Sequence, residues 1–266
     1  MIVGINASRA KSGGGIVHLK KILEHYSFSQ NKFTEIHIWG YESILNQIPS
    51  NKIFFKHIAF SSNRSLFYQI FWEKYKLPFQ LKKNNCNILI NLDAGSFCRF
   101  LPNITMSRDM LSYEPGIMNK YFFSKLWLRL FALKYVQVWS LRNATKSVFL
   151  TRYARNIIEK YSGKLNNSVM IPHGVDFINL KNLKKNKIFK KKYIEILYVS
   201  NFALYKNQDN VIVAFNLLTK RFKNLRLHLV GGHNNDSFYK KCKKLSKKNK
   251  RIIFHGNVLH SNINNY

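Results

Sequence analysis

The chain is poor in acidic residues: 12 aspartates and glutamates stand against 44 lysines and arginines, a formal net charge of +32. Such an excess suits phosphate-rich partners such as nucleic acid, anionic lipid or a nucleotide. Lysine, asparagine and isoleucine are abundant throughout, however, as a biased codon composition would produce. Two dense basic runs, 181–193 and 240–251, hold 15 of the 44. We interpret them as a solvated linker and a solvated helix face.

Cysteines are also few. Cys86, Cys98 and Cys242 are odd in number, far apart in the sequence and without the spacing of metal ligands. This usage fits a reducing cytoplasm, and neither a zinc site nor another metal cofactor is expected. The N-terminal segment MIVGINA has no basic region and no long apolar core, which argues against a signal peptide.

Long uninterrupted apolar runs are missing as well. The most apolar stretch, 121–139, contains Lys125, Arg129 and Lys134, so it does not have the pattern of a membrane span. It is either a core helix or a basic amphipathic helix on a membrane surface, and we favour the core helix. The sequence also lacks Ser/His/Asp spacing and paired carboxylates, so nothing in it supports hydrolytic chemistry.

What the sequence does contain is a regular alternation of strand-like and helix-like segments. From MIVGINA to VMIPHGV the alternation predicts βαβ units and a parallel sheet, and a second alternation starts at EILYVSN. The predicted fold class is α/β, with two Rossmann-like doubly wound domains. The expected domains are an N-terminal domain at 1–175, a basic linker at 176–193 and a C-terminal domain at 194–266. The last is too short to be complete.

Three consecutive glycines, Gly13 to Gly15, come directly before a helix-like segment near the N-terminus. Such a run is either a plain turn between strand and helix or a way to bring backbone N–H groups close to an anion or a sugar. The sequence around the triplet does not decide between the two.

The segment YVSNFALYKNQDNVIVAF carries the strongest chemical indication. Asn207 and Asp209 suit the cap and first turn of the following helix, yet Lys206 lies at the same positive end, where a cation is normally unfavourable. A bound diphosphate would resolve this conflict, whereas a lysine that turns into solvent would need no ligand. In the helix itself, four apolar residues are predicted to pack on a sheet: Val211, Phe215, Leu218 and Phe222.

Several motifs, in this order, resemble the family 4 retaining glycosyltransferases of the GT-B fold. They are SGGGIVHL, NITMSRDMLSYEP, SVFLTRYARNIIEKY, VMIPHGVDF, ILYVSNFALYKNQDNVIVAF, LHLVGG and IIFHGNV, and they extend over most of the chain. The resemblance implies transfer of a sugar from a nucleotide-sugar donor to a glycan or lipid-linked acceptor, with no metal. It also implies a cytoplasmic enzyme, compatible with a peripheral contact at the inner membrane face.

The resemblance assigns donor binding to five residues. Gly14 and Gly15 match a loop that approaches the donor phosphates and the reacting sugar, and Lys206 matches a phosphate-binding lysine. Asn201 stands where the family has an arginine, so it can hydrogen-bond a phosphate without neutralising it. Gly256, in FHGNV, matches a loop that meets the nucleotide base.

On the acceptor side, Arg108 and Asp109 occupy the place of a histidine-aspartate pair beside the reacting sugar. Arg108 would steady a phosphate or a sugar hydroxyl, and Asp109 would orient that hydroxyl. The alternative is an Arg-Asp pair that only stabilises a loop. His173, in the crossover motif IPHGV, is interpreted as part of a hinge.

The sequence departs from the family because a pair of glutamates that contacts the donor sugar and ribose is missing before Tyr266. We therefore expect a truncated or inactive form, or a binding-only relative. A different class remains as an alternative: a basic non-catalytic protein that binds nucleic acid or anionic membrane. No recognised nucleic-acid motif supports it, so no specific nucleic-acid partner is expected. The transferase hypothesis requires Lys206 and the glycine triplet to line one crevice.

Overall fold

The computed structural model describes residues 1–10, 14–26, 33–60, 64–174, 192–233 and 236–258. The chain forms two compact units, Met1–Gly174 and Val175–Tyr266, and each has its own hydrophobic core. The predicted linker at 176–193 lies outside the described residues except for its last two, and Gly13 of the glycine triplet lies outside them as well.

The first unit is built on a seven-stranded sheet in the order β3-β2-β1-β4-β5-β6-β7, in which every neighbouring pair is parallel. Its strands are β1 (Ile2–Asn6), β2 (Glu35–Gly40), β3 (Phe54–Ile58), β4 (Ile88–Asn91), β5 (Asn103–Ser107), β6 (Lys146–Phe149) and β7 (Ser168–Met170). Parallel strands need connections that cross the sheet, and the intervening helices make them. The predicted parallel α/β sheet is confirmed.

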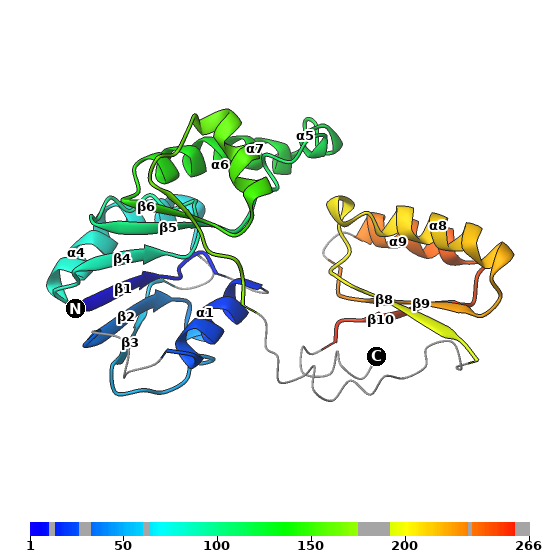
Figure 1. Ribbon diagram of the computed structural model, residues 1–266, viewed down its shortest axis with the longest axis horizontal. Coiled ribbons are helices and arrows are strands. Elements are labelled where there is room, and N and C mark those ends of the chain that lie inside the picture. Colours follow the sequence, from blue (N-terminus) through cyan, green and yellow to red (C-terminus); the bar gives the residue numbers. More distant parts are fainter. Residues whose placement is uncertain (11–13, 27–32, 61–63, 175–191, 234–235, 259–266) are drawn as a thin grey trace. The chain divides into compact units, whose positions relative to one another are not determined.

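Helices cover both faces of this sheet. They are α1 (Gly14–Glu24), α2 (Glu42–Leu45), α3 (Leu66–Phe71), η1 (Trp72–Lys76), α4 (Leu77–Lys83), α5 (Ile117–Lys120), α6 (Lys125–Arg142) and α7 (Arg152–Ser162). Leu19 and Leu23 of α1 join the core on one face, whereas Leu77 and Leu81 of α4 join a separate core on the other (Figure 1). The sheet is therefore doubly wound, as predicted.

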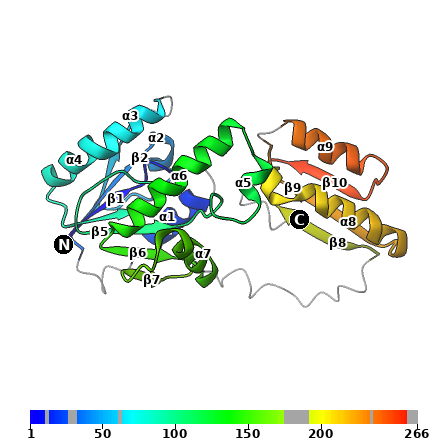
Figure 2. The same cartoon turned by 90° about the horizontal axis from the view of Figure 1, so that it is seen from above.

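The helical run α3-η1-α4 is continuous and contains a π-helical turn at η1 (Figure 2). Its buried side carries Trp72, Leu77 and Leu81, and it also carries the acidic residue Glu73, which is 1% exposed. A π-turn holds more residues than an α-turn and often marks a functional position. Here it brings a carboxylate into the interior of the unit.

The apolar stretch at 121–139 is the expected core helix only in part. From Lys125 on it belongs to α6, which contributes Leu141 and Val138 to a core cluster but whose fully buried residues are only Leu130, Gln137, Ser140 and Leu141. Leu128, Phe131 and Tyr135 on the same helix are 63%, 41% and 62% exposed. The helix carries apolar residues on all of its sides, but only one side faces the sheet. Among the helices of the described ranges, none is both long and apolar enough to cross a membrane.

The second unit contains a smaller parallel sheet in the order β10-β9-β8. Its elements are β8 (Ile194–Val199), the 3₁₀ turn η4 (Leu204–Lys206), α8 (Gln208–Arg221), β9 (Leu225–Val230), α9 (Asp236–Ser246) and β10 (Ile252–Gly256). Figure 1 shows α8 and α9 on one side of this sheet, where Ile212, Phe215 and Cys242 pack against Leu227 and Leu229. The second sheet repeats the strand-helix order of the first.

The predicted packing stripe of α8 is shifted. The buried residues of this helix are Gln208, Ile212, Phe215 and Thr219. Leu218 and Phe222 are each 45% exposed, so only Phe215 of the predicted stripe is fully buried, and Val211 packs partly against the core. The predicted stripe and the observed buried residues both have helical spacing, but it is the side that includes Ile212 that faces the sheet.

A line of one glutamate and two histidines occurs in both sheets. In each, one imidazole lies between a carboxylate and a second imidazole at hydrogen-bonding distance: Glu35, His37 and His57 at 2.9 and 2.9 Å, and Glu195, His228 and His255 at 2.7 and 2.8 Å. Burial, followed by the neighbouring histidine, lowers the pKa of both His57 and His255. These polar contacts link neighbouring strands and favour their register.

Candidate functional site

The candidate residues of the first unit follow strands at the carboxyl edge of its sheet. Gly14 and Gly15 come after β1 and begin α1, and Arg108 follows β5 directly. His173 follows β7. The carboxyl edge is the place where doubly wound sheets bind ligands, because the connecting loops gather there.

Gly15 lies against the Arg108 side chain. A Cβ atom built on Gly15 would be 3.1 Å from each of the two terminal guanidinium nitrogens, whereas a Cβ on Gly14 would meet no atom of the described residues within 4 Å. A side chain at Gly15 would therefore displace the guanidinium, and the glycine leaves room for Arg108.

The charge of Arg108 is only partly compensated. Its Nε atom is buried and has no hydrogen-bond partner among the residues that the structure describes. Burial lowers the pKa of the guanidinium, while the carboxylates of Asp93 and Asp109 act in the opposite direction. A half-buried cation in this setting is stabilised by an additional anionic or strongly polar group.

Two histidines that the sequence analysis did not assign to catalysis or binding lie near Arg108. His18 of α1 packs edge-to-face on His173, with ring centroids 4.5 Å apart. Burial, and then electrostatic repulsion from His173 and Arg108, lowers the pKa of His18 to about 4. His18 is therefore neutral near pH 7. The sequence did contain one indication that His18 belongs to the site: it lies three residues after Gly15, on the same side of a helix.

Asp109, the second residue of the predicted catalytic pair, lies next to Arg108 in the sequence and at the surface. The residue is exposed, and its Oδ1 accepts a hydrogen bond from the backbone N–H of Leu111 at 2.9 Å. Its remaining carboxylate oxygen can accept a hydrogen bond from a ligand hydroxyl. The role of Arg108 and Asp109 in catalysis stays a prediction.

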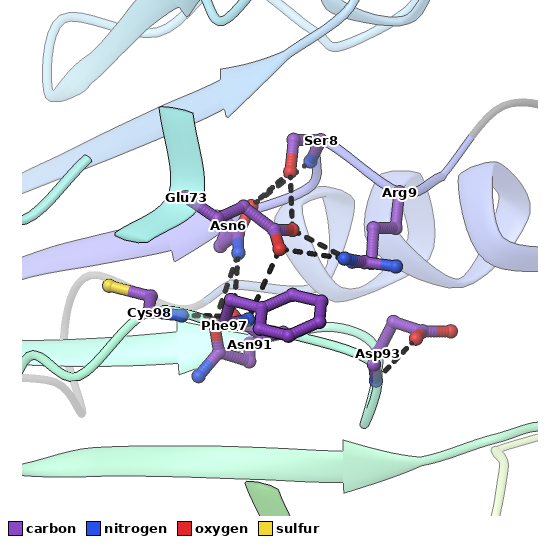
Figure 3. A network of polar contacts seen from close by, with 10 residues as sticks. Asn6, Ser8, Arg9, Glu73, Asn91, Asp93, Phe97 and Cys98 are labelled. Atoms are coloured by element: carbon purple, nitrogen blue, oxygen red, sulfur yellow. Dashed lines mark hydrogen bonds and ion pairs between the residues drawn. The ribbon is translucent and has the colours of Figure 1, made fainter. Parts of the chain in front are cut away.

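A buried polar network lies beneath the carboxyl edge, with Glu73 at its centre (Figure 3). Its two oxygens accept hydrogen bonds from Nε and Nη2 of Arg9 at 2.8 and 2.7 Å, and further bonds from Ser8 Oγ and the N–H of Phe97 at 3.3 and 3.1 Å. Burial opposes the charge of Arg9, but the Glu73 carboxylate outweighs it and raises the pKa of the guanidinium. No pattern in the sequence indicated this pair.

The network continues through the ends of three strands. Asn6, at the end of β1, donates from Nδ2 to Asn91 Oδ1 and Ser96 Oγ at 3.1 and 3.3 Å. Asn91 donates in turn to Thr105 of β5 at 3.2 Å. These bonds tie the ends of β1, β4 and β5 together and give the Gly15-Arg108 cluster a rigid base.

The candidate residues of the second unit also lie at a carboxyl edge. Asn201 follows β8, and its Oδ1 accepts a hydrogen bond from the N–H of Gly232 at 3.2 Å. Gly256 ends β10 with φ +69°, and its carbonyl oxygen accepts from the N–H of Gly231 at 2.8 Å. Asn201 and Gly256 thus flank the glycine pair that follows β9.

Lys206 is exposed at the end of η4, directly before α8. Its carbonyl oxygen accepts a hydrogen bond from Tyr198 Oη at 2.6 Å, which fixes the turn. Asn207 occupies the cap position but its side chain makes no capping hydrogen bond, because its backbone is left-handed with φ 56° instead of extended. Asp209 lies in the first turn, as predicted, and pairs with Lys241 at 2.7 Å.

The depressed pKa of His18 predicts a pH dependence of stability. The unfolded chain takes up a proton near the ordinary histidine pKa of about 6.5, whereas folded His18 does so only near pH 4. The free energy of unfolding should therefore fall as the pH drops from about 6.5 toward 4, and His18→Gln should reduce this slope. Urea unfolding at several pH values measures this change of the free energy of unfolding with pH.

The control is Lys20→Gln, at an exposed position of the same helix, which should keep the wild-type slope. An unchanged slope in His18→Gln would contradict the lowered pKa of His18.

The second unit carries a family pattern that is visible in its sequence. Residues 180–266 match the family model of glycosyl transferases group 1. Among curated proteins, none matches this chain. The matched segment includes Asn201, Lys206 and Gly256.

Solved structures resemble the chain in fold at low sequence identity. HepE from Anabaena, in complex with UDP-glucose, has a TM-score of 0.67 at 15% identity; the match covers 97% of this chain and 70% of HepE. A sucrose-phosphate synthase from Thermosynechococcus elongatus has a TM-score of 0.67 at 13% identity; the match covers 98% of this chain and 71% of the synthase. UDP-GlcNAc 2-epimerase from Neisseria meningitidis, bound to UDP-GlcNAc, has a TM-score of 0.52 at 12% identity; the match covers 97% of this chain and 73% of the epimerase.

These likenesses show the fold and not the reaction, since one architecture hosts several chemistries. The chain has the GT-B fold, and its residues 180–266 match the sequence pattern of glycosyl transferases group 1.

Proposed function

We propose that the protein is a retaining glycosyltransferase that moves a sugar from a nucleotide-sugar donor to a lipid-linked sugar or polysaccharide precursor. The observation that carries this proposal is the match of residues 180–266 to glycosyl transferases group 1. The site geometry is compatible with it, because the candidate residues of each unit lie at a carboxyl sheet edge.

The second unit would hold the donor diphosphate. The N-terminus of the 14-residue helix α8 presents the positive end of the helix dipole, and the exposed Lys206 adds a full positive charge beside it. Both would stabilise the charge that develops on the nucleoside diphosphate as it leaves. The solved HepE complex contains UDP-glucose, so a UDP-sugar is the first donor to test.

The first unit would hold the acceptor and the reacting sugar. Arg108 has a half-buried guanidinium whose Nε has no partner among the described residues, and Gly15 leaves room for its terminal nitrogens. This combination suits a phosphate or a sugar hydroxyl. Asp109 would accept a hydrogen bond from the acceptor hydroxyl, which would attack on the face from which the diphosphate departs. No side-chain nucleophile takes part.

The role of Lys206 is tested by replacing it with alanine. We expect kcat/KM for transfer from a UDP-sugar to fall about 10-fold to 100-fold, because one of the charges that stabilise the leaving diphosphate is lost. Lys206→Arg, which keeps the charge, should retain more activity than alanine. Release of UDP from UDP-glucose, UDP-galactose and UDP-GlcNAc is measured together with epimerisation of the sugar.

Lys220→Ala is the matched control, since this lysine lies in the last turn of α8. It should leave kcat/KM unchanged. Equal activity of the Lys206 and Lys220 variants would remove Lys206 from the site. Epimerised UDP-sugar without transfer, or UDP-sugar binding that none of the variants alters, would overturn the transferase assignment.

A further inference from the structure

The helical run α3-η1-α4 exposes a line of aromatic side chains that no core explains. Phe67, Phe71, Tyr75 and Phe79 are 84%, 48%, 55% and 69% exposed. They are four residues apart, a spacing that drifts around an α-helix of 3.6 residues per turn. The π-turn at η1 turns less per residue and offsets this drift, so the four rings stay on one side.

The exposed charged residues along this run are all cations. The basic residues are Arg64, Lys74, Lys76, Lys82 and Lys83. Three of them lie over rings: Lys74 Nζ is 5.1 Å from the centroid of Tyr75, and the Arg64 guanidinium carbon and Lys76 Nζ are 5.0 and 5.6 Å from that of Tyr68. The single acidic residue between positions 64 and 83 is Glu73, which is buried and paired with Arg9.

A second aromatic line follows α6. Phe123, Trp127, Phe131 and Tyr135 are again four residues apart, and their successive ring centroids are 6.4, 5.5 and 5.1 Å apart. Phe123 is 87% exposed and has φ 54°, a left-handed conformation that is unfavourable for a bulky residue. Between positions 116 and 142 the chain has no acidic residue, and its basic residues are Lys120, Lys125, Arg129, Lys134 and Arg142.

A groove joins the two helical segments. Ile70 and Lys74 line it from the α3-η1 side and Tyr135 and Trp139 from α6, around a volume of about 400 Å³. Arg99 lies in the same groove, with its guanidinium carbon 5.2 Å from the Trp139 ring. The groove thus brings the α3-η1 segment next to α6, and of the two aromatic lines only Tyr135 lines it. We call the two lines, the cations on their segments and the groove between the segments the aromatic-basic surface.

We propose that the aromatic-basic surface docks the protein on an anionic phospholipid bilayer. Phenylalanine rings gain free energy when they enter the boundary between headgroups and acyl chains, and nearby lysines and arginines pair with lipid phosphates. Leu66 and Leu128, which are 55% and 63% exposed beside the two lines, would gain from acyl chains but not from a nucleic acid. The lack of exposed acids along both segments matches an anionic surface.

The test measures cosedimentation of the full-length protein with vesicles of phosphatidylcholine alone or with phosphatidylglycerol added. Wild type should bind the anionic vesicles and bind the neutral ones at least about tenfold more weakly. Phe67→Ser with Phe123→Ser should weaken binding to anionic vesicles about tenfold at every salt concentration. Lys82→Ala with Lys83→Ala should weaken it at low salt and reduce its salt dependence.

Phe222→Ser, at a 45%-exposed position of the second unit, is the matched control and should bind vesicles as wild type does. Thermal unfolding of each variant tests whether its fold is intact, and UDP-sugar binding tests the proposed donor site. A failure of the docking proposal can therefore be told apart from a failure of the transferase proposal. The docking proposal is overturned if the phenylalanine double variant binds vesicles like wild type. It is also overturned if double-stranded DNA competes for the same surface with equal affinity and equal sensitivity to Phe67→Ser.

Discussion

Replacing Glu73 by alanine should lower the free energy of unfolding by about 3–5 kcal/mol, because the change leaves Arg9 without its partner in the interior. The Glu73 side chain is 1% exposed and that of Arg9 18%, and the two form a bidentate pair. The alanine also removes the acceptor for the Phe97 N–H. Chemical denaturation followed by circular dichroism measures the loss.

Glu73→Gln separates charge from shape. The amide keeps the volume and one acceptor oxygen but no longer compensates the guanidinium, so its cost should lie between those of wild type and alanine. Glu42→Ala, at an exposed position in the first turn of α2, should change stability by about 0.5 kcal/mol or less. A loss in Glu73→Ala no larger than in Glu42→Ala would mean that the pair contributes nothing to folding.

Gly231→Ala should destabilise the second unit by about 3 kcal/mol or more. Gly231 has φ +148°, and a Cβ there would overlap the carbonyl oxygen of Ser200 and lie 2.9 Å from the N–H nitrogen of Asn201. These are backbone atoms, which cannot move aside as a flexible side chain can. Because the clash falls at Asn201, donor binding should weaken together with stability.

Gly232→Ala is the control for this prediction. A Cβ at Gly232 would lie 3.7 Å from Asn257 and 3.8 Å from Asn201 Oδ1, which is ordinary contact. Thermal unfolding of both variants, followed by a probe in the second unit, gives the comparison. If Gly231→Ala and Gly232→Ala unfold at the same temperature, the close approach of β9 to Ser200 is not required for folding.

The strand-helix alternation could be read from the sequence because it depends on the local period of apolar residues. Residues of β1 and β4 are continuous apolar runs, and the parallel sheet that they predict is observed. The same local reading misplaced the buried side of α8 and the exposure of α6. A helical period shows that a helix has an apolar stripe, but two stripes of equal period differ only in which one meets the sheet.

The candidate site divides in the same way. Lys206 shortly before α8 and the glycines at the start of α1 were visible in the sequence, because a helix terminus is a local feature. His18 and Glu73 were not assigned, because their importance depends on partners that are distant in sequence. Glu73 lies 64 positions from Arg9 and meets it only after the π-turn carries the carboxylate under the sheet edge.

By itself, the sequence determined the alternation of elements, the excess of positive charge and the positions of the helix termini, since each follows from neighbouring residues. Tertiary structure alone decided that Gly15 makes room for Arg108, that Glu73 pairs with Arg9, and that a groove lies between the α3-η1 segment and α6. The physical reason is that burial and pairing depend on which faces the sheet covers and which strand ends meet. No local pattern encodes those long-range contacts.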